Sequence, residues 1–122
     1  SALLTMPQVE METQHVFHAG VYARTVFLRD GVVITGALIK IPTLLIISGD
    51  VTVYLGGKSE RLTGYNVMKA NAGRKQVFVS HADTWMTMFF PTNAMTVEEA
   101  EAEFTDEYNL LLSHINENEV QL

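Results

Sequence analysis

Two histidines near the start of the chain are the first residues whose type could bind a metal ion. His15 and His18 lie three residues apart in a stretch that is predicted to be extended. Side chains three apart on a strand point to opposite faces, so the two imidazoles could hold one ion only if the backbone turns between them. The chain has no cysteine, which excludes a thiolate metal site and a disulfide framework. The pair is therefore a weak alternative for a metal site at a surface or an interface.

A polar run after a glycine turn is the candidate for binding a ligand. Arg74, Lys75 and Gln76 follow this turn directly. Ser80 lies four residues beyond Gln76, so these two share one face of the predicted strand. A guanidinium, ammonium or amide group placed there could recognise an anion, whereas ordinary surface charge is the alternative interpretation.

The remaining ionisable side chains in this part of the chain do not form a catalytic set. His81 stands beside a predicted turn, and no serine or cysteine nucleophile has a matching neighbourhood. Lys40 interrupts an apolar strand and is expected to point outward. Because catalysis needs positioned acids, bases or a metal ion, we predict no catalytic residue.

Composition and charge limit the kind of protein. The chain has 122 residues, of which 48% are hydrophobic, as expected of one domain with a real core. Of its 14 acids, eight lie in residues 96–122, which contain no Lys or Arg. The basic residues, all in the rest of the chain, are too scattered to form a phosphate-binding stripe, so nucleic-acid binding is not expected. No apolar run is long enough to span a bilayer, and we expect a soluble protein made in the cytosol.

The pattern of β-branched residues and glycines predicts an all-β fold. Residues 31–55 are two apolar runs that we interpret as strands hinged at residues 48–50. Some eight short strands are expected, without alternating helices, which is typical of a sandwich or barrel. Outside residues 31–55, the predicted strands are residues 16–17, 21–28, 59–62, 65–70, 74–80 and 84–90.

The acidic C-terminal segment is predicted to be helical. Thr96 and Glu99 have the spacing of a capping box, and apolar residues then recur at helical intervals. A second short helix, capped by Thr105 or Asp106, would run toward Ile115. The predicted organisation is an N-terminal arm (1–14), a β-barrel (15–92) and an acidic helical extension (93–122).

The chain also resembles a known family over residues 20–107. The segments IISGDVTVYLGG, RLTGYNV, NAGRKQV and SHADTWMTM are similar to the small cupin-like proteins of tailed bacteriophages. The wider similarity is to the cupin superfamily. The resemblance implies an all-β, small cupin-like jelly-roll barrel, here followed by a short C-terminal helical extension.

The resemblance also locates the positions where a cupin barrel holds a metal ion. In the first cupin motif, the glutamate position falls on Pro42 and the two histidine positions fall within residues 35–39, none of which is His, Asp or Glu. In the second motif, Gln76 stands at the histidine position and Ser80 at the asparagine position. These residues offer at most two weak neutral oxygen donors. We therefore expect no internal metal ion and no cofactor.

Two functions of different classes remain. The first is a non-enzymatic interaction or structural protein, phage-encoded and homo-oligomeric, which acts in the host cytoplasm or on the virion with phage structural proteins as partners. The second is a small-molecule sensor, or a cupin-type epimerase, isomerase or oxygenase with an atypical site. The first is preferred, because the strand face expected to line the barrel is apolar. Its residues are Ala37, Ile39, Ile41, Leu45 and Ile47.

A run of four apolar residues supports the oligomer. Residues 44–47 are apolar at every position, so both faces of their strand need a cover. The barrel interior can cover one face. The C-terminal helices or a second subunit must cover the other, and we expect the N-terminal arm and the central strands to contribute to the interface between subunits.

Overall fold

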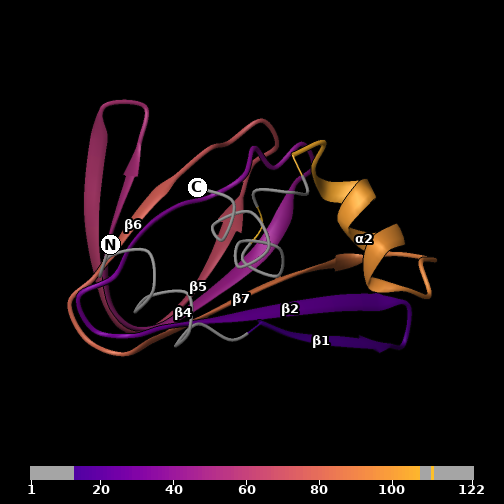
Figure 1. The fold of residues 1–122 in the computed structure, drawn as a ribbon, viewed down its shortest axis with the longest axis horizontal. Helices are drawn as coiled ribbons and strands as arrows, with labels where there is room; N and C mark the ends of the chain where they lie inside the picture. Colours follow the sequence, from indigo (N-terminus) through magenta and orange to yellow (C-terminus); the bar gives the residue numbers. More distant parts are fainter. Residues whose placement is uncertain (1–12, 108–110, 112–122) are drawn as a thin grey trace, which may run out of the picture.

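A computed structural model describes residues 13–107 and Leu111, which form a curled antiparallel sheet with one short helix (Figure 1). The predicted all-β fold class is confirmed. In chain order the elements are β1 (Thr13–His18), β2 (Val21–Leu28), β3 (Val33–Thr35), β4 (Thr43–Leu55), β5 (Lys58–Ala70), β6 (Val77–Ser80), β7 (Thr84–Pro91) and α2 (Val97–Phe104).

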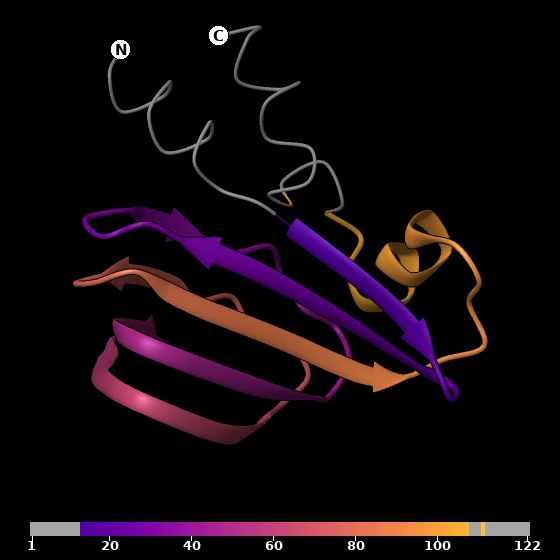
Figure 2. The same cartoon turned by 90° about the horizontal axis from the view of Figure 1, so that it is seen from below.

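Strand β4 is the strand on which the sheet is built. It pairs with β5 along its whole length, from Thr43 opposite Ala70 to Leu55 opposite Lys58. On its other edge, the first part of β4 pairs with β7 and the second part with β6. The sheet therefore runs in the order β1-β2-β7-β4-β6-β3, with β5 beside β4. Figure 2 shows β1, β2, β7, β4 and β5 side by side in a sheet that curves.

The predicted turn at residues 48–50 is wrong, because β4 passes through it without reversing. Gly49 has a φ of 147° and lies opposite Gly64 of β5. A Cβ on Gly49 would lie 2.5 Å from Thr84 Oγ1, a distance that real Cβ atoms essentially never show. The glycine lets β4 pass close to the start of β7. Beyond this point β4 pairs with β6 instead of β7. The break predicted between the strands at residues 59–62 and 65–70 is also wrong, because residues 63–64 continue the pairing with β4 and β5 is one strand rather than two.

Other boundaries differ less from the predicted ones. The strand at residues 21–28 is confirmed as β2 with the same bounds. Strand β6 begins only at Val77, because Arg74 forms a single bridge to Ile39 instead of continuing the strand. Strand β1 begins at Thr13, within the segment predicted as an arm, and residues 1–12 of that arm lie outside the described part of the chain.

Helix α2 packs its apolar side into the core. The predicted capping box is confirmed: the Glu99 N–H donates to Thr96 Oγ1 at 3.2 Å, and the Thr96 N–H donates to Glu99 Oε1 at 3.1 Å. Phe104, at the end of the helix, is fully buried. Its ring lies 6.5 Å from that of Tyr22 and 5.9 Å from that of Phe90, measured between centroids. These contacts fix the helix against β2 and β7.

The second predicted helix falls mostly outside the described residues. Within the part that is described, Thr105 has an extended backbone and Leu111 is buried. The described part of the chain contains no helix with the length and apolarity needed to cross a lipid bilayer.

Candidate functional site

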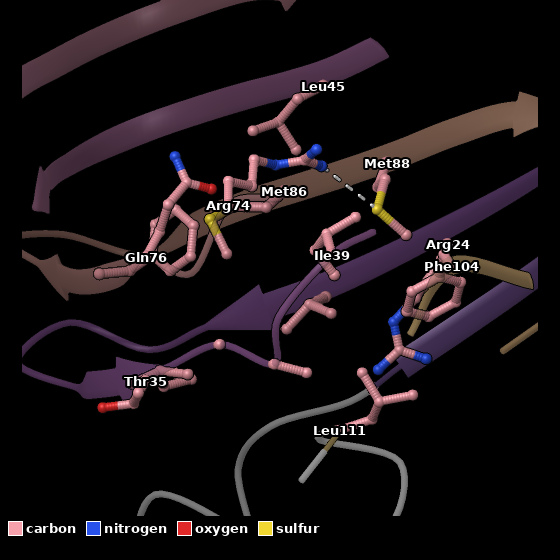
Figure 3. A pocket seen from close by; sticks show the side chains of 15 residues that line it. Arg24, Thr35, Ile39, Leu45, Arg74, Gln76, Met86, Met88, Phe104 and Leu111 are labelled. Carbon is pink, nitrogen blue, oxygen red and sulfur yellow. Dashed lines mark hydrogen bonds between the residues drawn. The ribbon is translucent and has the colours of Figure 1, made fainter. Parts of the chain in front are cut away.

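A cavity of about 110 Å³ lies inside the curled sheet (Figure 3). Two arginines, Thr35, Gly36 and Gln76 interrupt a wall that is otherwise apolar. Its apolar lining residues are Val26, Ile34, Ala37, Ile39, Leu45, Phe78, Met86, Met88, Phe104 and Leu111. The predicted interior residues are thus partly confirmed, but they do not share one strand face. Ala37 and Ile39 belong to the segment between β3 and β4, and only Leu45 of those lining the cavity belongs to β4.

Arg74 reaches the cavity because the chain turns just before it. Gly73 has a φ of 76°, which glycine adopts without strain. The backbone N–H of Gly73 donates to the carbonyl of Ile39 at 2.7 Å, and the Ile39 N–H donates to the carbonyl of Arg74 at 2.8 Å. This bridge directs the side chain of Arg74 inward, where it is only 6% exposed.

The guanidinium of Arg74 is held by neutral groups. Nη1 donates to the carbonyls of Asn71 at 2.8 Å and Ile41 at 3.3 Å. Nη2 donates to Thr43 Oγ1 at 2.7 Å and lies 3.7 Å from Met88 Sδ. Nε has no hydrogen-bond acceptor among the described residues. Burial lowers the pKa of Arg74, but a guanidinium remains charged at neutral pH.

A second arginine in the cavity wall does have a carboxylate. Arg24 Nη1 of β2 donates to Glu101 Oε2 of α2 at 3.4 Å, and both side chains are buried. The guanidinium carbon also lies 5.8 Å from the centroid of the Phe104 ring. The sequence analysis missed this pair. Its signal was the alternation of β2, in which Arg24 takes an inward position between Tyr22 and Val26.

A wider cleft adjoins the cavity. Its volume is about 600 Å³, and it shares Leu45, Arg74 and Gln76 with the cavity wall. The rest of its wall combines apolar side chains with polar and charged ones, among them Lys58 and Glu60. Arg74 and Gln76 therefore stand between an inner apolar space and an outer, more polar one.

The other two predicted ligand-binding residues do not line the cavity. Lys75 is exposed, and its Nζ donates to Glu107 Oε1 at 2.9 Å. Ser80 is buried, but its hydroxyl accepts from the Val32 N–H at 2.9 Å and donates to the carbonyl of Arg29. Ser80 thus ties the loop before β3 to β6.

The predicted histidine pair is not brought together. His15 points inward on β1, where its Nδ1 hydrogen-bonds with the Tyr22 hydroxyl at 2.7 Å, while His18 is exposed on the opposite face. Burial raises the pKa of Tyr22. Within residues 13–107 and Leu111, no three side chains of the metal-binding types form a cluster.

Two further side chains singled out in the sequence lie on the surface. Lys40 is partly exposed, and its Nζ lies 2.7 Å from Asp106 Oδ1. The His81 ring nitrogen Nε2 hydrogen-bonds with the Thr52 hydroxyl at 2.7 Å on an exposed edge. Neither reaches the cavity.

The cavity does not suit the metal ion of a cupin barrel. Of the residues at cupin ligand positions, Gln76 lines the cavity and offers one neutral amide, while Ser80 is bonded elsewhere. The charged groups in the wall are the guanidiniums of Arg24 and Arg74, which repel a cation. The charged groups of the wall therefore favour an anion over a cation.

Comparison with known proteins gives matches of fold only. No protein-family model matches the sequence, and no curated protein matches it. Among solved structures, a cupin superfamily protein of Desulfitobacterium hafniense matches at 13% identity and a TM-score of 0.55, covering 69% of this chain and 79% of that one. KdgF from a Halomonas species matches at 18% identity and a TM-score of 0.54, covering 68% and 82%.

A third match agrees with these two. A cupin-2 domain protein of Shewanella frigidimarina has 7% identity and a TM-score of 0.53, covering 66% of this chain and 79% of that one. Identities this low are evidence for the fold alone. Together with the curled antiparallel sheet, they show that this chain has the fold of the small cupin jelly-roll proteins.

Proposed function

We propose that this chain is a non-enzymatic, cupin-like protein that assembles with copies of itself through the outer face of its sheet. The observation that carries the proposal is the apolar character of this face. We define the outer face by the outward-pointing side chains within residues 23–27 of β2, 44–48 of β4, 65–69 of β5 and 85–89 of β7, which are Ala23, Thr25, Phe27, Leu44, Ile46, Ser48, Tyr65, Val67, Lys69, Trp85, Thr87 and Phe89.

Large apolar side chains stand exposed in neighbouring rows of the outer face. Tyr65 and Trp85 both pair with Ser48, one from each side of β4. Val67 pairs with Ile46 in the next row and is 60% exposed. Exposed apolar surface that is continuous across several strands is typical of an interaction site.

Charge favours a second copy of the chain as the partner. A two-fold contact brings the same patch of each subunit together, so like charges in the patch are brought near one another. Within this part of the sheet Lys69 is the charged side chain, and the next outward charges along β4 and β5, Asp50 and Arg61, are paired with each other, whereas the whole chain carries a net charge of −6. This face can therefore pair with itself with little repulsion, and it offers a charged partner almost nothing to bind.

The groups near the cavity support a function other than catalysis. General acid and base catalysis needs groups that exchange protons near neutral pH. The guanidiniums of Arg24 and Arg74 do not, and the carboxylate of Glu101 is bonded to Arg24. An enzyme of the cupin type would need other residues to act.

The resemblance to cupin-like proteins of tailed bacteriophages supports an assembly on the virion. In this proposal the oligomer is phage-encoded and binds phage structural proteins. Mass spectrometry of purified particles tests it. The chain should copurify with capsid or tail in fixed proportion, and its absence from washed particles would contradict the virion assignment while leaving self-assembly unaffected.

Self-assembly is tested by light scattering coupled to size exclusion at micromolar concentration. We expect a mass of at least twice the 13.6 kDa of one chain. Val67→Glu places two carboxylates in the proposed contact and should give a monomer. Val33→Glu is the matched control, because Val33 is 56% exposed but lies on the edge strand β3, which β6 separates from β4. A monomeric wild-type protein, or equal effects of the two variants, would contradict the proposal.

A further inference from the structure

The two arginines of the cavity differ in how their charge is balanced. Arg24 has the carboxylate of Glu101, whereas Arg74 is bonded to carbonyls, a hydroxyl and a sulfur, and no carboxylate of the described residues is paired with it. A buried charge is normally paired with an opposite one. The space beside Arg74 is therefore where a negative charge would be favoured most.

One edge of the Arg74 guanidinium carries a buried donor, Nε, that no described residue accepts. Nε and Nη2 lie on the same edge, and two such nitrogens can grip a carboxylate through parallel hydrogen bonds. Nε has no acceptor among the described residues. Nη2 lies 3.7 Å from Met88 Sδ, and a thioether sulfur is a weak acceptor that a carboxylate oxygen can replace. Figure 3 shows Arg74 and Met88 joined across the cavity wall.

The rest of the cavity suits a short hydrocarbon. Ile39, Leu45 and Met86 line it beside Arg74, and its volume of about 110 Å³ is somewhat below the roughly 150 Å³ of a cavity known to accept benzene. Gln76 supplies an amide donor and lines both the cavity and the wider cleft. A multiply charged ligand such as a phosphate would need more donors than Arg74 and Gln76 provide.

We infer that this cavity binds a small monocarboxylate with a short apolar body. The carboxylate lies against Nε and Nη2 of Arg74, and the hydrocarbon lies among Ile39, Leu45 and Met86. The inference goes beyond the proposed self-assembly and does not depend on it, because the cavity is on the inner side of the sheet.

Calorimetric titration of the full chain with sodium butyrate tests the inference. We expect saturable binding in the micromolar to millimolar range, and a higher melting temperature at millimolar butyrate than at the same concentration of sodium chloride. The uncharged 1-butanol should bind on the order of tenfold more weakly or not at all, since it lacks the anion. Equal binding of the alcohol, or no binding of butyrate, would overturn the inference.

Two variants locate the anion. Arg74→Met removes the guanidinium but keeps an apolar side chain of similar reach, and it should abolish butyrate binding. Lys75→Met is the matched control, because Lys75 is a neighbouring cation that points to the surface and is paired with Glu107. Loss of binding in the control, or unchanged binding in Arg74→Met, would overturn the assignment.

A readout on the wild-type protein keeps the test decisive if Arg74→Met fails to fold. Methyl resonances of methionine report on the cavity, since Met86 and Met88 line it, whereas Met95 does not line it and is 82% exposed. Butyrate should shift the signals of Met86 and Met88 and leave that of Met95 in place. Shifts at Met95 alone, or no shift at saturating butyrate, would contradict binding in the cavity.

Discussion

The two faces of β4 carry opposite kinds of surface. Leu44 and Leu45 are neighbours of identical type, yet Leu44 is 43% exposed on the outer face and Leu45 is 7% exposed in the cavity wall. The inner face encloses two cations, while the outer face leaves Trp85 and Val67 in contact with solvent. In an ordinary sheet the charges face water and the apolar groups face the core. Both faces of this sheet depart from that pattern: the inner one encloses two cations, and the outer one exposes large apolar side chains.

Removal of residues 93–122 is the most severe way to test the inner face. Phe104 and Leu111 would be lost from the core, and burial of each such side chain contributes about 1.5 to 3 kcal/mol. Arg24 would also lose Glu101. We expect a chain that aggregates or melts at a much lower temperature, as followed by circular dichroism. A soluble product with an unchanged melting temperature would show that this segment is detachable.

A single substitution isolates the buried ion pair. Glu101→Gln leaves Arg24 buried beside a neutral amide, and loss of one partner of a buried pair costs about 3 to 5 kcal/mol. Urea unfolding should show this loss. The double variant Arg24→Met with Glu101→Leu removes both charges and should recover most of the stability. If the double variant is as unstable as Glu101→Gln, packing rather than the unpaired charge is responsible.

The two leucines of β4 give a matched comparison of the faces. Leu45→Ala enlarges an existing cavity and should lower the free energy of unfolding by about 2 to 4 kcal/mol. Leu44→Ala should lower that of the isolated subunit by less than about 1 kcal/mol, since the side chain is already half exposed. It should instead weaken self-association, measured as a rise in the dimer dissociation constant. Equal losses of stability would remove the distinction between the faces.

The smallest effect is expected from an ion pair that belongs to neither face. Hydrogen bonds from Lys75 and from the Leu38 N–H lower the pKa of Glu107. A carboxyl with a lower pKa in the folded state stabilises the fold above its unfolded-state value of about 4.3, and this contribution is lost as the pH falls through the lower value. The melting temperature should therefore drop slightly below about pH 4, and less so in Glu107→Gln. An identical pH profile for the variant would show that other carboxyls dominate.

The sequence predicts the local parts of this fold better than the long-range ones. The bounds of β2 follow from its own alternation, and the capping box of Thr96 and Glu99 is a contact within one helical turn. Gly49 and Gly64 were taken as turns because a glycine has the same appearance in a turn and in a bend. For Gly49 the approach of Thr84, from a distant strand, decides between them, whereas a Cβ on Gly64 would meet no atom within 4 Å.

The candidate site also has parts that a local pattern in the sequence predicts and parts that depend on distant contacts. Arg74 and Gln76 were found because they follow a glycine turn, which is a local signal. Their burial depends on Ile39 and on the curl of the sheet, which no local pattern contains. Arg24 and Glu101 are 77 residues apart, so their pairing could not be inferred from spacing. The alternation of β2 places Arg24 on the buried side of the strand, and a buried cation indicates a buried partner.

The close approach at Gly49 has a consequence for the pairing of the strands during folding. Strand register is normally fixed by an alternating pattern, but residues 44–47 are apolar at every position, so a slip by one residue would keep both faces apolar. A slip would, however, place Ser48 or Asp50 against Thr84, where only a glycine fits. We infer that Gly49 selects the register of β4, and through it that of β5, β6 and β7.

Trp85 offers a way to observe this selection. It is the one tryptophan of the chain and pairs with Ser48, next to Gly49. Refolding of Gly49→Ala, followed by tryptophan fluorescence, should be slower than that of Ser48→Ala and should yield more aggregate. Equal refolding of the two variants would contradict the inference. In most sheets an alternating polar and apolar pattern selects the strand register. Here the absence of a side chain at Gly49 selects it, because only a glycine fits beside Thr84.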